Sequence, residues 1–145
     1  MVTYSDTSFL VALYVEEDHT TSAHQCMERI SSLPFTSFHR LELRSALRAR
    51  VFRETLTRQD LQMALRLSDE DLLNGTLRHM PLVWADAFRE AERLGEAHGA
   101  ETGVRSGDLL HVASAVVLDA KEFVTFDQRQ KELARRAGLK VKMPR

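Results

Sequence analysis

The spacing of apolar positions changes several times along the chain, and these changes predict strands that alternate with helices. Short apolar runs typical of buried strands occur near the start, around residue 34, around residue 78 and twice after residue 121. Between them, apolar residues recur three or four positions apart, as in Leu43, Leu47 and Val51. Such alternation favours an α/β fold with a mainly parallel sheet and helices on both faces. We therefore expect three α/β/α layers around about four to five strands.

Capping and breaking residues set the expected boundaries of these elements. Strands are expected at residues 2–5, 34–37, 76–83, 122–126 and 139–143. Helices are expected at residues 8–15, 20–31, 38–54, 57–73, 84–98, 106–119 and 129–138. Thr57 and Ser106 are expected to cap helix starts, and Gly99 and Gly138 to end helices. Right-handed crossovers would bring the carboxyl ends of the strands to one edge of the sheet.

Length and composition fit a single domain over residues 1–145. The chain is 43% hydrophobic and 28% charged, and no linker rich in proline, glycine or serine divides it. The single cysteine, Cys26, excludes an internal disulfide and a thiolate zinc site, which fits a reducing compartment. No signal-peptide pattern is visible, and the apolar stretches are shorter than the ~20 residues that span a bilayer. We expect a soluble cytoplasmic protein with no membrane partner.

The formal charge of −1 hides an uneven distribution of charges along the chain. Six arginines against two glutamates lie between Arg40 and Arg58, and eight basic residues follow from Lys121 onward. Mixed solvated helix faces are the ordinary explanation of such a pattern. The distribution also permits a basic surface of the kind that a nucleic-acid backbone requires.

Four acidic residues lie where an α/β fold could direct carboxylates into one crevice. Asp6 and Asp127 each end an apolar run that is typical of a strand, whereas Glu42 and Asp108 lie near the starts of helices. In open α/β sheets, ligands bind beyond the carboxyl ends of the strands. Carboxylates gathered there repel one another unless some protonate or a cation enters. Oxygen ligands alone suit Mg²⁺ or Mn²⁺.

Each acid also has a purely structural explanation. Asp6 and Asp127 could cap the helices that follow them, and Asp108 would favour the positive end of a helix dipole whatever it binds. Glu42 could pair with a neighbouring arginine such as Arg44. Taken singly, these explanations are as good as a functional one, so the four acids count only as a set.

Three segments resemble, in order, motifs of the PIN domain family, and in particular of VapC-type toxins from bacterial toxin–antitoxin pairs. They are YSDTSFLVALYVEED, SFHRLELRSAL and RSGDLLHVASAVVLDAKEFVTFDQRQKELARRAGLKV. The similarity extends from Ser5 to Val141. It implies a PIN-like fold and a Mg²⁺- or Mn²⁺-dependent ribonuclease that is usually dimeric and inhibited by a cognate antitoxin.

The resemblance assigns roles to residues of this chain. It implies that the metal-binding catalytic acids are Asp6, Glu42, Asp108 and Asp127. Thr7 and Thr125 add hydroxyls near them, and Thr125 could hydrogen-bond an acid or simply favour a strand. Four arginines lie near the acids in sequence and could meet RNA phosphates: Arg44, Arg48, Arg105 and Arg129.

Two other functions stay open at this level. The chain could be an RNA-processing nuclease outside any toxin–antitoxin pair, or a non-catalytic module that binds RNA or protein. An antitoxin-like reading frame just upstream would favour the toxin. Retention of all four acids argues against a non-catalytic module.

Overall fold

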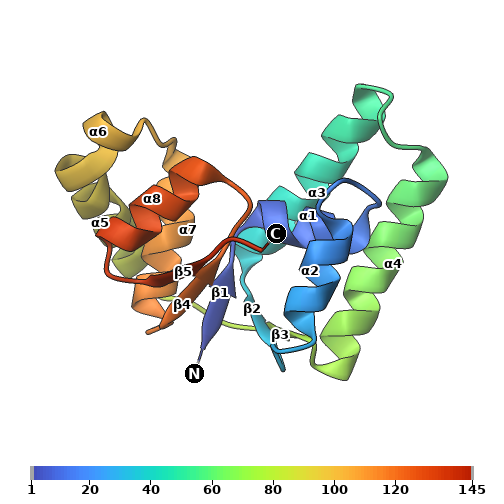
Figure 1. Ribbon diagram of the computed structural model, residues 1–145, viewed down its shortest axis with the longest axis horizontal. Helices are drawn as coiled ribbons and strands as arrows, with labels where there is room; N and C mark the ends of the chain where they lie inside the picture. Colours follow the sequence, from blue (N-terminus) through green and yellow to red (C-terminus); the bar gives the residue numbers. More distant parts are fainter. Residues whose placement is uncertain (1, 145) are drawn as a thin grey trace. The chain divides into compact units, whose positions relative to one another are not determined.

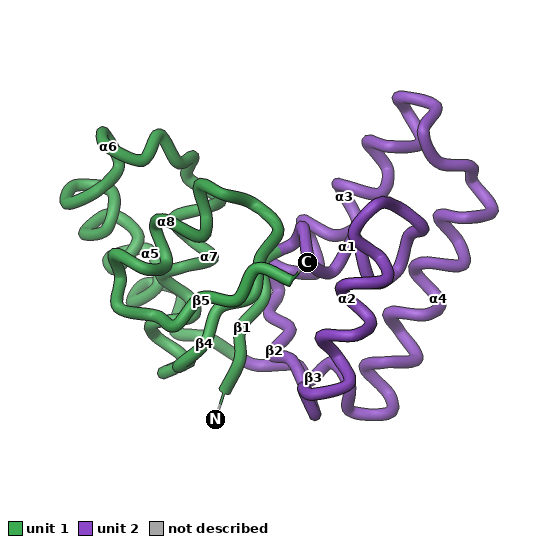
Figure 2. The backbone as a smooth tube through the Cα atoms, in the orientation of Figure 1, with its two compact units in different colours: residues 1–6, 81–144 green, residues 7–80, 145 purple. Residues whose placement is uncertain are grey.

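The computed structural model describes residues 2–144, which form two compact units (Figure 2). Unit 1 combines the described residues up to Asp6 with residues 81–144. Unit 2 consists of residues 7–80. Unit 1 is therefore built from two segments that are distant in sequence, whereas unit 2 is continuous.

Unit 1 contains a parallel three-stranded sheet in the order β1-β4-β5 (Figure 1). Its strands are β1 (Thr3–Ser5), β4 (Glu122–Val124) and β5 (Lys140–Lys142). Its helices are α5 (Trp84–Leu94), the π-helix η1 (Gly95–Gly99), α6 (Ala100–Thr102), α7 (Ser106–Val117) and α8 (Gln128–Arg136). The central strand β4, which pairs on both sides, is buried along its whole length, including Glu122.

The core of unit 1 forms where β1 and β4 pair. Tyr4 and Phe123 lie opposite each other in the register and stack with ring centroids 5.5 Å apart. Both side chains are completely buried. This contact fixes the first strand of the chain against a strand near its other end.

Unit 2 packs four helices with a parallel pair of short strands. The strands are β2 (Leu33–Phe35) and β3 (Leu77–His79). The helices are α1 (Thr7–Tyr14), α2 (Thr20–Met27), α3 (Ser37–Phe52) and α4 (Arg58–Asn74). The apolar stripe of α3 is buried at Leu43 and Leu47, as its spacing predicts.

The predicted α/β class with parallel strands is confirmed. The five strands divide into the sheet of three and the pair. Thr57 caps α4, accepting a hydrogen bond from the Asp60 N–H at 3.0 Å, as predicted. None of the helices in the described part of the chain has the length and apolar character needed to cross a bilayer.

Several boundary predictions were wrong, among them the ends of α2, at Met27 rather than Ser31, and of β3, at His79 rather than Val83. The helix that begins at Trp84 does not stop at Gly99, because η1 and α6 continue it to Gly103. Arg105, not Ser106, is the N-cap residue of α7. The strand expected at residues 34–37 ends at Phe35, because the Thr36 hydroxyl caps α3 by accepting from the His39 N–H.

Candidate functional site

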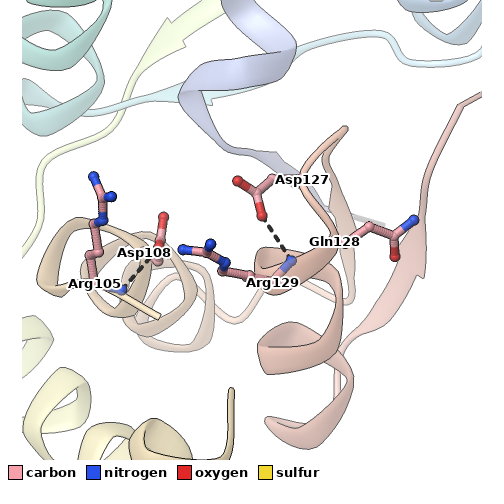
Figure 3. Close-up of a pocket in the computed structure, with 5 residues that line it drawn as sticks. All are labelled: Arg105, Asp108, Asp127, Gln128 and Arg129. Atoms are coloured by element: carbon pink, nitrogen blue, oxygen red, sulfur yellow. Dashed lines mark hydrogen bonds between the residues drawn. The ribbon is translucent and has the colours of Figure 1, made fainter. Parts of the chain in front are cut away.

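A cavity of about 470 Å³ in unit 1 brings together two of the predicted acids and two of the predicted arginines (Figure 3). Its lining residues are Arg105, Asp108, Asp127, Gln128 and Arg129. Gln128 was not predicted from the sequence, although it directly follows Asp127. Polar and charged side chains therefore form a small open site beyond the end of β4.

Asp127 is held in place as the N-cap of α8. Its Oδ1 accepts hydrogen bonds from the backbone N–H groups of Arg129, at 2.8 Å, and Gln130, at 3.2 Å. The structural explanation considered for this acid is therefore correct, and it is compatible with a functional one. One carboxylate oxygen is occupied by the cap, and the residue also lines the cavity.

Asp108 is held in a similar way at the start of α7. It is the third residue of the helix, and its Oδ2 accepts the backbone N–H of Arg105 at 3.0 Å. Figure 3 shows this bond and the one from Asp127 to Arg129. Two carboxylates are thus fixed by backbone donors on different helices and line the same space.

Asp6 is nearly buried, with 3% of its surface exposed, and a single hydroxyl links it to Asp127. The Thr125 Oγ1 donates a hydrogen bond to Asp6 Oδ2 at 2.6 Å and accepts one from the Asp127 N–H at 2.9 Å. Thr125 is itself completely buried. Of its two predicted roles, the hydrogen bond to an acid is the one observed.

A second buried contact joins the elements that carry Asp6 and Asp108. The Tyr4 hydroxyl and His111 Nδ1 are 2.8 Å apart, and both side chains are at most 2% exposed. Tyr4 lies in the strand that ends just before Asp6, and His111 lies one helical turn after Asp108. The contact therefore ties β1 to α7.

Glu42 belongs to unit 2, on α3. The Thr7 hydroxyl donates a hydrogen bond to Glu42 Oε1 at 2.6 Å. Thr7 directly follows Asp6 in the chain. The predicted hydroxyl at position 7 is thus the partner of a predicted acid.

The four predicted phosphate contacts separate into two groups. Arg105 and Arg129 line the cavity with the acids. Arg44 instead faces Asp69, with Nη2 3.6 Å from Oδ1. Arg48 lines a different cavity, in unit 2. Because the described ion pairs leave Arg105 and Arg129 unpaired, both are available to an anion.

The donor set of the cavity fits a hard divalent cation. Mg²⁺ keeps several of its waters and binds through one or two carboxylates, and two carboxylates line this space. Within residues 2–144, no group of three or more His, Cys, Asp or Glu side chains is placed to hold a metal ion. Asp108 and Asp127 are therefore the candidate direct ligands.

The fold and the cavity together define a class of α/β proteins that gather carboxylates beyond the carboxyl ends of parallel strands. The chain belongs to the PIN domain family, whose model matches residues 3–136. The match spans both compact units and confirms the family resemblance of the sequence. No curated protein was found to match the chain.

Three solved structures share this fold. VapBC2 from Rickettsia felis, bound to a DNA fragment from their promoter, has 17% identity and a TM-score of 0.67, covering 98% of both chains. PAE2754 from Pyrobaculum aerophilum has 18% identity and a TM-score of 0.63, covering 97% of this chain and 90% of its own. FitAcB from Neisseria gonorrhoeae has 14% identity and a TM-score of 0.63, and the match covers 99% of this chain and 98% of that one.

Proposed function

We propose that this PIN-domain protein is a divalent-metal-dependent endoribonuclease and the toxin of a VapC-type toxin–antitoxin pair that acts in the cytoplasm. PIN domains are in general nucleases. The observation that carries the proposal is the cavity in which Asp108 and Asp127 meet Arg105 and Arg129. Cleavage of a phosphodiester requires both kinds of group close together. The carboxylates bind the metal ion, and the arginines bind the phosphate.

The carboxylates would hold the metal and the arginines would hold the substrate. Bound Mg²⁺ or Mn²⁺ lowers the pKa of a coordinated water and neutralises charge on the phosphate. Asp108 and Asp127 are its direct ligands in this proposal. Arg105 and Arg129 bind phosphate oxygens, for which the guanidinium fork is well suited.

The remaining acids have supporting roles in the proposal. Asp6 is a third carboxylate for the metal or its waters, oriented through the Thr125 hydroxyl. Glu42, which accepts the Thr7 hydroxyl, orients a metal-bound water or a second cation. In this proposal the reaction is a hydrolysis with no covalent protein intermediate.

An antitoxin protein and a second copy of this chain are the proposed partners. The support is the resemblance to VapC-type toxins, together with apolar side chains that remain exposed on α4: Met63, Leu67 and Leu73. Light scattering of the purified chain, alone and with the product of the adjacent reading frame, tests both partners. If the chain is a monomer and does not bind the protein encoded by that reading frame, both partners are removed from the proposal.

The test of the nuclease is cleavage of a pool of structured RNAs with Mg²⁺, with Mn²⁺ and with chelator. Asp108→Asn and Asp127→Asn should abolish cutting, because the amide removes the charge that binds a cation. Both amides retain an oxygen that can accept the capping N–H, so the fold should persist. Asp60→Asn, on an exposed acid in α4, is the matched control and should cut normally.

The outcomes separate the possible functions. Metal-dependent cutting that both cavity variants lose supports the endoribonuclease. Cutting without any effect of the neighbouring reading frame's product supports an RNA-processing nuclease outside a toxin pair. RNA binding without cutting under either metal would contradict the proposal and leave a binding module.

A further inference from the structure

The loop that joins α3 to α4 in unit 2 borders a cavity of about 600 Å³ that shares no residue with the acid cavity. Its lining residues are Arg48, Val51, Phe52, Glu54, Arg58, Leu61, Gln62 and Leu65. Four of these side chains are apolar and two are arginines. The proposed catalytic chemistry uses none of these residues.

The arginines of this region differ in how their charge is compensated. Arg40 and Arg44 both face Asp69, at 4.0 and 3.6 Å. Arg50 pairs with Glu17 at 3.0 Å. The other three arginines make no ion pair with any described residue, and all of them lie around the loop: Arg48, Arg53 and Arg58. Positive charge is therefore left uncompensated at one end of the helix pair.

Phe52 lies among these arginines at the last position of α3. Its side chain is 88% exposed, although burying a phenylalanine is worth about 1.5–3 kcal/mol. Leu61, which lines the same cavity, is only 8% exposed, so the cavity combines a buried apolar side chain with an exposed ring. A solvent-exposed aromatic ring between unpaired arginines is suited to a partner that offers both a flat face and negative charge.

We propose that the α3–α4 tip, defined as Arg48, Phe52, Arg53 and Arg58, is a binding site for single-stranded RNA. Phe52 stacks on a base, and the arginines contact the flanking phosphates. Stacking on aromatic side chains combined with a positively charged groove is the general way in which proteins bind single strands. The inference rests on the proposed nuclease function only in taking RNA as the substrate.

The charges favour RNA over an apolar protein surface. A protein that covered Phe52 would also remove three guanidinium groups from water, which is costly unless each is paired. Within the cavity only Glu54 offers a negative charge. Phosphates on either side of a stacked base supply the missing counter-charges.

The test is binding of a fluorescently labelled, mixed-sequence single-stranded RNA by the full chain in chelator, where no cutting occurs. Phe52→Leu should weaken binding about 5- to 100-fold, the usual contribution of one stacked base. The triple variant Arg48→Gln, Arg53→Gln, Arg58→Gln should reduce the slope of log K against log salt by about 2. Phe88→Leu is the matched control, since Phe88 is also exposed on a helix and should not alter binding.

Each possible result either supports or overturns the proposed RNA-binding site. Loss of affinity in the tip variants, with Phe88→Leu unchanged, supports it even if the protein cuts no RNA. Tip variants that bind as the wild type does, or a wild type that does not bind at low salt, overturn it. A change of molar mass by light scattering in Phe52→Leu, with RNA affinity unaltered, would assign the tip to a protein interface instead.

Discussion

The Thr125 hydroxyl uses both of its hydrogen-bonding roles within unit 1. It donates to Asp6 and accepts from the backbone of Asp127, so one side-chain oxygen sets the relation between two acids. Because the group is completely buried, water cannot replace either bond. A side chain of the same shape without the hydroxyl would remove both of these buried hydrogen bonds.

Thr125→Val should therefore lower the free energy of unfolding by about 1–3 kcal/mol, because both hydrogen bonds of a buried hydroxyl are lost. Thr125→Ser keeps the hydroxyl and should recover most of that loss. Urea unfolding of the three proteins measures the difference. Equal stability of the valine variant and the wild type would show that the bridge contributes nothing.

The pKa of Tyr14, in unit 2, is strongly shifted. Its pKa is raised far above the usual value by burial first, and further by its hydrogen bond to Asp71 and by that carboxylate's charge. The folded protein therefore keeps the phenol protonated at pH values where the unfolded chain releases the proton. The stability from this group is complete below pH ~10 and is lost as the pH rises above it.

Above pH ~10, the wild type should lose up to about 1.4 kcal/mol of stability per pH unit through Tyr14. Tyr14→Phe lacks this titration and should show a shallower decline. Urea unfolding at pH 8, 10 and 11 compares the two slopes. Parallel slopes would mean that Tyr14 titrates alike in the folded and unfolded chains.

At the scale of elements, α5, η1 and α6 form one continuous helical path with two glycines in opposite conformations. Gly99 has φ −59° and ψ −44°, which any residue adopts in a helix. Gly103 has φ +67° and ends the path. A Cβ added at either position would meet no atom within 4 Å, so the backbone alone decides the effect of a substitution.

Gly99→Ala should stabilise the protein by about 0.5–1 kcal/mol, because alanine loses less backbone entropy in a helix. Gly103→Ala should destabilise it by about 1 kcal/mol, because a left-handed conformation strains any residue with a Cβ. Thermal unfolding of both variants measures whether the melting temperature rises for Gly99→Ala and falls for Gly103→Ala. Two shifts of the same sign would contradict the assigned backbone conformations.

The end of this helical path is a feature that the sequence did not predict. The period of apolar residues located the helix that starts at Trp84, but no local signal distinguished Gly99 from Gly103 as its end. The same holds for α7, where the apolar pattern gave the helix and the cap was displaced by one residue to Arg105. Periodicity reports burial, whereas ends depend on backbone dihedral angles that neighbouring packing decides.

At the scale of the whole molecule, the sequence predicts the four acids as a set, but it does not predict the contacts that connect them. Family motifs marked all four, and two of them line one cavity. The bridge through Thr125 joins residues 119 positions apart, a pairing that no spacing in the sequence encodes. The distribution of arginines between Asp69, the acid cavity and the tip likewise depends on tertiary packing.

Metal binding should be visible in the stability of the whole protein, independently of cleavage. A cation that binds only the folded state at 100 times its dissociation constant adds about 2.7 kcal/mol. Mg²⁺ should therefore raise the melting temperature of the wild type and of Asp60→Asn, but not that of the double variant Asp108→Asn, Asp127→Asn. The same rise in all three would indicate a general ionic effect and would remove the metal site.

The discontinuity of unit 1 has a consequence for the synthesis of the protein. A chain emerging from the ribosome from its N-terminus can complete unit 2 early, since residues 7–80 are continuous. Asp6 is made before unit 2, yet β1 pairs with β4 only after β4 is translated, and the Thr125 hydroxyl reaches Asp6 later still. A truncated translation product would carry the RNA-binding tip without the cavity. The proposed ribonuclease would therefore be complete only after Asp108, Thr125 and Asp127 have all been synthesised.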